Sequence, residues 1–242
     1  MKKIILLITV LALSMPVVWS QGQENNSIPL IGSTAPTFSA ESTNGLITFP
    51  IDFGNHWKIL ISHPKDFTPV CSSELLELAN LQQKFDQLNV KIAVVSTDEL
   101  SQNDAWKKSL ESIDYKGHQT PEIKFPLISD KDKVISAKYG MLHYPVSTTK
   151  DVRGVFIIDP DDVVQAVFFY PMDVGRNIDE IVRTVEALQE AHNNVVTPAD
   201  WNPGEDVMLS YLNKQQEKEE MLKNPNIYQI VWYMTMEKNP SH

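Results

Sequence analysis

The sequence predicts an α/β domain in which helices flank a mixed central β-sheet, followed by a small C-terminal extension. Two short apolar runs, at residues 58–62 and 90–97, are typical of strands buried on both faces of a sheet. Each run is followed by a stretch with helical periodicity, and a hairpin pattern and a last helix come after them. This order of elements is typical of a thioredoxin-like fold.

The first half of the domain is predicted to contain one hairpin and two strand–helix units. Residues 34–49 form the hairpin, because Asn44-Gly45 favours a tight turn between two extended segments. The helix that begins at Pro69 places its apolar side chains near a 3.6-residue period as far as Leu88. A second helix is expected at 101–112.

The second half is predicted to add a third helix and two strands. The helix spans residues 130–139, and Gly140 is a usual C-terminal stop. Strands at 154–159 and 163–170 are joined by Pro160-Asp161-Asp162, which favours a turn. These strands complete the mixed sheet.

The last predicted helix of the domain begins at Asn177 and runs to about residue 191, with a glutamate three residues after Asn177 to complete a capping box. The pattern then changes. Residues 195–242 are predicted to be an appendage rather than a second full domain, with a charged helix at 215–223 and an amphipathic or edge segment at 227–236.

The N-terminus is predicted to lie outside the folded domain. Two lysines, an apolar run at 4–18 and the small residue Ser20 are typical of a secretory signal peptide. We therefore expect a signal peptide at 1–20, a polar linker at 21–29 and the thioredoxin-like domain at 30–194. The run is shorter than the about 20 residues that span a membrane, so we expect export to the periplasm or outside the cell, without stable membrane insertion.

Composition excludes several kinds of function. The net charge of −10 argues against nucleic acid or an anionic membrane surface as a partner. The single cysteine, Cys71, excludes an intrachain disulfide and a CxxC redox pair. The six histidines show no paired spacing, so no metal site is predicted.

The position of Cys71 indicates a reactive thiol. Thr68 suits the N-cap of the helix and Pro69 suits its first position, which places Cys71 in the first turn. Free amide N–H groups and the helix dipole favour an anion there, and therefore the thiolate. His63 and Lys65 would act in the same direction. The alternative is an inert buried cysteine, the commoner fate of a lone cysteine among apolar residues.

The sequence around Cys71 resembles a known signature. Pro64-x-x-x-Thr68-x-x-Cys71 resembles the active-site motif of the peroxiredoxins, the alkyl hydroperoxide reductase/thiol-specific antioxidant family, and residues 62–71 resemble its one-cysteine (1-Cys) branch. The resemblance covers about residues 28–208. Further similar stretches lie at 153–159, 170–171, 175–180 and 197–208.

The resemblance implies a thiol-dependent peroxidase and assigns four catalytic residues. Cys71 is the nucleophile that becomes a sulfenic acid, and Thr68 forms a hydrogen bond with the peroxide. Arg153 holds the thiolate and the developing negative charge, and Pro64 shields the sulfur from water. Considered singly, Thr68 could be only a cap, Pro64 only a turn residue, and Arg153 only a solvated charge.

Three supporting residues follow from the same resemblance. Glu74 lies one turn after Cys71 and is expected to pair with Arg176 and to orient the arginines. His63 corresponds to a histidine that this branch places beside the sulfur. The alternative for Glu74 and Arg176 is a purely structural ion pair.

The resemblance also implies partners. Because no second cysteine exists, the sulfenic acid must be reduced by an external thiol of the glutathione or thioredoxin type. A homodimer is expected, with 195–242 as the dimerisation segment, and no metal, flavin or haem cofactor is implied. Some relatives carry a phospholipase serine in a Gly-Asp-Ser-Trp stretch. His56 stands at that position in Gly54-Asn55-His56-Trp57, so no lipase activity is expected.

Three other kinds of protein could contain a cysteine at this position. A thiol–disulfide oxidoreductase would need a cysteine where Glu74 stands. A hydrolase would pair Cys71 with His63 or His143, and a binding or chaperone module would not need Cys71 at all. Redox sensing is the most compatible companion of peroxide reduction.

Overall fold

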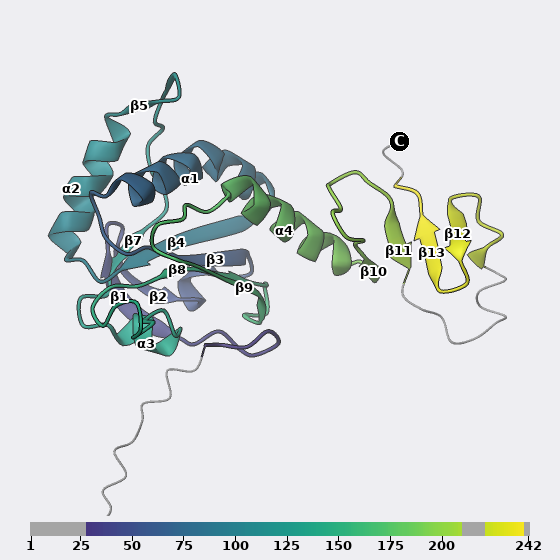
Figure 1. Cartoon of the computed structure of the whole chain (residues 1–242), viewed down its shortest axis with the longest axis horizontal. Helices are drawn as coiled ribbons and strands as arrows, with labels where there is room; N and C mark the ends of the chain where they lie inside the picture. Colours follow the sequence, from purple (N-terminus) through teal and green to yellow (C-terminus); the bar gives the residue numbers. More distant parts are fainter. Residues whose placement is uncertain (1–27, 210–220, 240–242) are drawn as a thin grey trace, which may run out of the picture.

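The computed structural model describes residues 28–209 and 221–239, and its centre is a seven-stranded mixed sheet (Figure 1). The strand order is β2-β1-β7-β4-β3-β8-β9. The strands are β1 (Phe38–Ser42), β2 (Gly45–Phe49), β3 (Trp57–Ser62), β4 (Val90–Ser96), β7 (Leu127–Ser129), β8 (Arg153–Ile158) and β9 (Val164–Tyr170). The predicted α/β thioredoxin-like fold with a mixed sheet is confirmed.

The direction of the strands explains where the site forms. β3 runs parallel to β4, and β4 runs parallel to β7, whereas β8 is antiparallel to both β3 and β9. The carboxyl ends of β3 and β4 therefore lie at the same edge of the sheet as the beginning of β8. Ligands of open α/β sheets usually bind at this edge.

Helices cover both faces of the sheet (Figure 1). α1 (Pro69–Gln87), α2 (Leu100–Glu111) and α4 (Ile178–Ala191) bury Leu75, Trp106 and Val185 in a core on one face. The short α3 (Val134–Lys138) packs on the other face, where Phe49, Ile135 and Tyr139 belong to a second core. The strands between the two cores are apolar on both sides, as their sequences predicted.

The third helix is much shorter than predicted. It was expected at 130–139, but α3 begins only at Val134. The carboxylate of Asp130 accepts hydrogen bonds from the amides of Ile135 (3.0 Å) and Ser136 (2.7 Å). Lys133 has a left-handed backbone (φ 60°), so the chain turns once more before the helix starts.

The other helix boundaries agree with the prediction within one or two residues. At the start of α4 the side chain of Asn177 accepts from the amide of Glu180 at 3.3 Å, as the capping motif predicted. The reciprocal half of the box is absent, because the Glu180 carboxylate pairs with Arg183 instead. The structure also contains the short strand β7 and three small elements that were not predicted: η1 (Ile51–Phe53), β5 (Asp114–Tyr115) and β6 (His118–Gln119).

The C-terminal extension forms a small sheet of its own at the far end of α4 (Figure 1). Its strand order is β10-β11-β13-β12, built from β10 (Val195–Val196), β11 (Val207–Leu209), β12 (Ile227–Val231) and β13 (Met234–Glu237). The single segment expected at 227–236 is therefore a hairpin.

Three predicted features fall wholly or mostly outside the described residues. The signal peptide at 1–20 and most of the linker lie in the undescribed residues 1–27, and most of the charged helix lies in 210–220. Within the described ranges, no helix is both long enough and apolar enough to cross a membrane.

Candidate active site

Cys71 lies in the first turn of α1, just beyond the carboxyl end of β3. Between them, Phe67 adopts a left-handed conformation (φ 55°) that turns the chain toward the helix. Pro69 is the first helical residue, and Thr68 precedes it with an extended backbone. The Cys71 side chain is fully buried, so its chemistry depends on the few groups that touch it.

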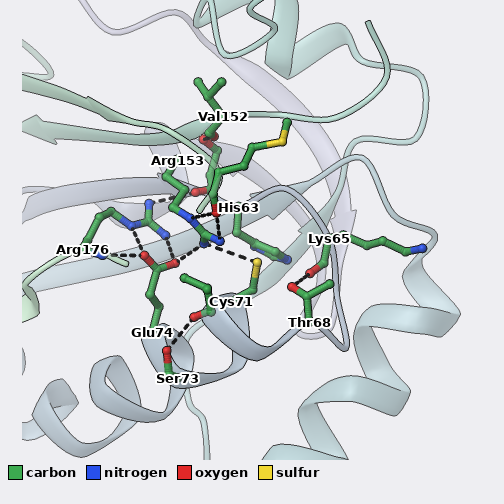
Figure 2. Close-up of polar contacts among 12 residues, drawn as sticks. His63, Lys65, Thr68, Cys71, Ser73, Glu74, Val152, Arg153 and Arg176 are labelled. Atoms are coloured by element: carbon green, nitrogen blue, oxygen red, sulfur yellow. Dashed lines mark hydrogen bonds and ion pairs between the residues drawn. The ribbon is translucent and has the colours of Figure 1, made fainter. Parts of the chain in front are cut away.

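Thr68 stands at the predicted N-cap position, but its hydroxyl does not cap the helix. Its Oγ1 donates to the carbonyl of Lys65 at 2.8 Å, three residues earlier (Figure 2). The hydroxyl therefore stabilises the turn between β3 and α1, and its lone pairs are left as acceptors. Pro64, in the same turn, is buried and has no backbone N–H.

The guanidinium group of Arg153 faces the sulfur. Its Nη1 lies 3.4 Å from Cys71 Sγ and donates to Glu74 Oε2 at 2.7 Å (Figure 2). Its Nε and Nη2 both donate to the carbonyl of Met172, at 2.9 and 2.6 Å. All three guanidinium nitrogens are thus held at once, and Nη1 has a second N–H that can donate to the sulfur.

Glu74 joins the two arginines. Its carboxylate accepts from the backbone amide of Arg176 (2.8 Å), from Arg176 Nε (2.9 Å) and from Arg176 Nη2 (2.6 Å). Burial on its own would raise the pKa of Glu74, but Arg176 first and Arg153 second lower it below the ordinary value. Glu74 is therefore ionised in this cluster.

We call Glu74, Arg153 and Arg176 the arginine cluster. All three side chains are nearly inaccessible to solvent, at 2–6% exposure. Two guanidinium groups and one carboxylate leave one positive charge in a buried place, where unbalanced charge is costly. An anion beside Arg153 would balance this charge, and the Cys71 sulfur lies in that position, 3.4 Å from Arg153 Nη1.

His63 lies in the loop between β3 and α1, and its hydrogen-bond partner is another residue of that loop. Its Nε2 is 2.8 Å from Asp66 Oδ1, and its ring packs on Trp106 with a centroid distance of 4.9 Å. Its Nδ1 has no hydrogen-bond partner among the described residues. His63 is thus a buried, carboxylate-paired histidine. His143, the other histidine considered as a base, packs against Phe169.

His63, Asp66 and Asp98 are the described residues that could hold a metal ion, with ligand atoms within 4.8 Å of one another. Asp98 Oδ2 accepts from the backbone amide of Asp66 at 2.8 Å, and Asp98 Oδ1 accepts from Lys150 Nζ at 2.9 Å. The Lys150 ammonium group therefore already supplies a positive partner for this carboxylate.

Three buried carboxylates and a half-buried lysine lie at the same edge of the sheet, and we call Asp98, Asp130, Lys150 and Asp151 the acid cluster. Asp151 is fully buried, and neither of its carboxylate oxygens has a hydrogen-bond partner among the described residues. Burial raises the pKa of Asp151 to about 7. The nearby Ser136 hydroxyl donates to Asp130 at 2.5 Å.

The structure brings Cys71, Arg153, Glu74 and Arg176 into direct contact, whereas Thr68 and His63 bond to their own loop. Sequence reasoning missed Asp66, Asp98, Lys150 and Trp106. One signal could have found Asp98: it follows β4 directly, and β4 is parallel to β3, so both carboxyl ends reach the same edge.

A thioredoxin-like fold with a buried thiol against a fixed guanidinium defines a thiol-dependent redox protein. The comparisons identify the family. Residues 31–167 match the family model "AhpC/TSA family", and residues 187–224 match "C-terminal domain of 1-Cys peroxiredoxin".

Curated relatives and solved structures agree. A peroxiredoxin of Methanosarcina mazei is 43% identical over 216 residues, covering 88% of this chain and 99% of its own. Peroxiredoxin-6 of Gallus gallus is 43% identical over 187 residues, covering 74% and 82%. The structure of a mutant peroxiredoxin 6 of Arenicola marina has a TM-score of 0.78 at 31% identity, covering 88% and 99%.

The chain therefore belongs to the AhpC/TSA family and, within it, to the 1-Cys peroxiredoxins, which are thiol-dependent peroxidases. A yeast mitochondrial 1-Cys peroxiredoxin is also similar, with a TM-score of 0.76 and 34% identity over 87% of this chain and all of that one.

Proposed function

We propose that Cys71 is the peroxidatic nucleophile and reduces hydrogen peroxide and small organic hydroperoxides. One observation carries this proposal: Arg153 Nη1 lies 3.4 Å from Cys71 Sγ while the rest of its guanidinium is held by Glu74 and Met172. A cationic group fixed beside the sulfur stabilises the thiolate and is in place for the charge that develops on the leaving oxygen.

The first stage of the proposed reaction is the oxidation of Cys71 by the peroxide. The thiolate of Cys71 attacks one peroxide oxygen, so that an S–O bond forms as the O–O bond breaks. The leaving oxygen departs as hydroxide or alkoxide and takes a proton to become water or an alcohol. The sulfur, oxidised by two electrons, is left as a sulfenic acid.

The neighbouring residues support this step in different ways. Because the Thr68 hydroxyl proton is donated to Lys65, its oxygen is available to accept a hydrogen bond from the peroxide O–H. Pro64 offers no N–H to compete for the sulfur. We assign Glu74 and Arg176 to orienting Arg153, and His63 to packing on Trp106 beside the loop.

An external thiol is proposed to complete the cycle, because the chain has no second cysteine. A first thiol condenses with the sulfenic acid to give a mixed disulfide and water, and a second thiol releases Cys71 and a disulfide. The yeast structure describes thiol resolution through glutathione/thioredoxin systems. A reductant of the glutathione or thioredoxin type is proposed here, and no metal, flavin or haem.

We also propose that this protein is a homodimer. The thioredoxin-like domain would span 30–194, and residues 195–242 would form the dimerisation segment. The hairpin of β12 and β13 exposes Ile230 (57%), Trp232 (64%) and Tyr233 (59%), more apolar surface than a small sheet needs in water. Sedimentation equilibrium of the full chain and of a chain ending at residue 194 would test this assignment.

Export is proposed from residues 1–20, which we interpret as a signal peptide followed by a linker at 21–29. The mature chain would then act in the periplasm or outside the cell, without membrane insertion and without nucleic acid as a partner. N-terminal sequencing of the protein recovered from cell fractions would test both the compartment and the cleavage after Ser20.

The decisive experiment measures the intact mass of the mature protein before and after one equivalent of hydrogen peroxide, with a sulfenic-acid trap present. We expect fast, complete formation of one trap adduct, abolished by Cys71→Ser. An unchanged mass over minutes, while Cys71 still alkylates slowly, would contradict the peroxidase assignment of this thiol and favour a binding module.

A further inference from the structure

We propose that Ser62 is a positioning residue of the peroxidase reaction and holds Arg153 in place beside Cys71. The inference rests on the proposed roles of Cys71 and Arg153. Ser62 is the last residue of β3 and is fully buried. It is the one polar residue at the site end of a strand that is otherwise buried between two apolar cores, so its hydroxyl needs partners there.

Those partners are the peptide groups on both sides of Arg153. Ser62 Oγ donates to the carbonyl of Val152 at 2.7 Å and accepts from the amide of Gly154 at 2.8 Å (Figure 2 draws Val152 beside Arg153). One hydroxyl therefore fixes the backbone immediately before and after the arginine. This sets the direction in which the Arg153 side chain leaves the strand.

The hydroxyl is needed because the strand pairing stops there. β3 and β8 pair as far as Ile61 with Val155, and the same register would next pair Ser62 with Gly154. Instead, Arg176 Nη1 donates to the carbonyls of both Ser62 (2.8 Å) and Gly154 (2.9 Å). The arginine replaces the backbone pairing at that point, and the Gly154 amide donates to the Ser62 side chain at 2.8 Å and, at a longer 3.1 Å, to the Val152 carbonyl.

Ser62 thus contacts both arginines of the cluster in different ways. Its hydroxyl holds the peptides that flank Arg153, and its carbonyl holds the guanidinium of Arg176. The approach is close: a β-carbon added to Gly154 would lie 3.0 Å from Ser62 Oγ. A glycine next to Arg153 is therefore part of the same arrangement, because it lets the two strands meet at this point.

The energetic consequence follows from geometry. Without the hydroxyl, the Val152 carbonyl loses its side-chain donor and the Gly154 amide loses the acceptor on Ser62, in a buried place. The segment would relax toward other partners, and Arg153 would move with it. A shift on the order of 1 Å in a charge-stabilising group lowers a rate by up to about 100-fold.

The test is Ser62→Ala, a change that removes one oxygen and should leave the fold intact. We expect the rate constant for Cys71 oxidation by hydrogen peroxide to fall by about tenfold or more. Alkylation of Cys71 by iodoacetamide should fall much less, because that reaction has no leaving oxygen of a peroxide for Arg153 to stabilise.

The chain contains a matched control. Ser42, 3% exposed, also donates to a carbonyl (Gly45, 2.7 Å) and accepts from an amide (Asn44, 3.1 Å), but it lies in the β1–β2 hairpin. Ser42→Ala should cost similar stability in urea unfolding and leave the peroxide rate unchanged. An equal loss of rate in both variants would overturn the proposal.

A double-mutant cycle separates positioning from general loosening. In an Arg153→Met background, Ser62→Ala should change the residual peroxide rate by less than about twofold, because no guanidinium remains to be positioned. A full tenfold loss in that background, or no loss in the wild-type background, would contradict the role of Ser62. If the Arg153→Met variant reacted with peroxide at the wild-type rate, that result would contradict the role proposed for Arg153 itself, and with it the positioning role of Ser62.

Discussion

The arginine cluster and the acid cluster lie at the same edge of one sheet and are both buried, yet their charges are balanced in opposite ways. In the arginine cluster, two guanidinium groups face one carboxylate, and every polar atom of Glu74 is bonded. In the acid cluster, three carboxylates share one lysine, and Asp151 has no hydrogen-bond partner among the described residues.

The difference shows how each excess charge is neutralised. The surplus positive charge of the arginine cluster favours an anion, and the Cys71 sulfur is the group within reach, at 3.4 Å. The surplus negative charge of the acid cluster is reduced by a proton on Asp151, because burial raises the pKa of that carboxyl to about 7. One cluster therefore stabilises a nucleophile, and the other titrates near neutral pH.

Removing the carboxylate of the arginine cluster should have the largest effect. Glu74→Gln leaves two buried guanidinium groups without a counter-charge, so we expect the free energy of unfolding to fall by about 3–5 kcal/mol at neutral pH. Because the pKa of Glu74 is lowered in the folded state, the difference from wild type should shrink as pH falls below 4.5. Urea unfolding at several pH values measures both.

The control for this prediction is Glu186→Gln. Glu186 pairs with Lys84 at 2.7 Å between α1 and α4, but the lysine is 43% exposed. Equal destabilisation by the two substitutions would mean that burial does not distinguish the arginine cluster from an ordinary ion pair.

The next largest effect concerns the shape of the cation rather than its charge. Arg153→Lys keeps the positive charge but cannot bond to Met172, Glu74 and the sulfur at once, so we expect the peroxide rate constant to fall by about 100-fold. Stopped-flow oxidation of Cys71 measures it. Arg183→Lys, at a half-buried arginine paired with Glu180, is the control. A fully active Arg153→Lys would mean that charge alone is sufficient.

The acid cluster should reveal itself in the pH dependence of stability. The contribution of Asp151 to the free energy of unfolding is complete below pH 3.8, the ordinary pKa of its carboxyl group. It is lost as the pH rises through about 7, the pKa of Asp151 in the folded protein. Wild type should therefore lose on the order of 2 kcal/mol between about pH 5 and pH 8 that Asp151→Asn does not lose. Urea unfolding at several pH values measures this difference. If the free energies of unfolding of both proteins changed with pH in the same way, Asp151 would not titrate in this range.

The smallest effect is expected at a partly exposed ion pair. Glu180→Gln removes two hydrogen bonds to Arg183, of 2.6 and 2.8 Å. Because both side chains reach solvent, the free energy of unfolding should change by less than about 1 kcal/mol, and less still in high salt. Thermal or urea unfolding measures this change. A loss of stability larger than about 1 kcal/mol would show that hydrogen-bond geometry, and not burial, makes the arginine cluster more stabilising than this pair.

Local sequence patterns were enough to predict the fold and the position of the Cys71 thiol. The strand–helix order defined the sheet, and the spacing of Thr68, Pro69 and Cys71 fixed the thiol in the first turn of α1 because helix N-termini have strong residue preferences. Arg153, Glu74 and Arg176 were reached through the resemblance to a family, since nothing local indicates that a given arginine will be buried.

The acid cluster could not be predicted. Asp98, Asp130 and Asp151 each follow or precede a strand, where an exposed carboxylate is the ordinary outcome. Their burial depends on the order of strands in the sheet, which brings loops from distant parts of the chain together. The predicted start of α3 was wrong for a related reason: the side chain of Asp130 takes the amides that a longer helix would have used.

Cys71 and Arg153 meet across 82 residues of sequence, and β8 must be placed between β3 and β9 before they can touch. Bringing two residues together across such a separation costs loop-closure entropy, which the rest of the fold must offset. A chain that is still extended has a thiol with no guanidinium beside it. The contact between thiol and guanidinium therefore exists only in the assembled sheet, and an unfinished chain meets peroxide as an ordinary cysteine peptide.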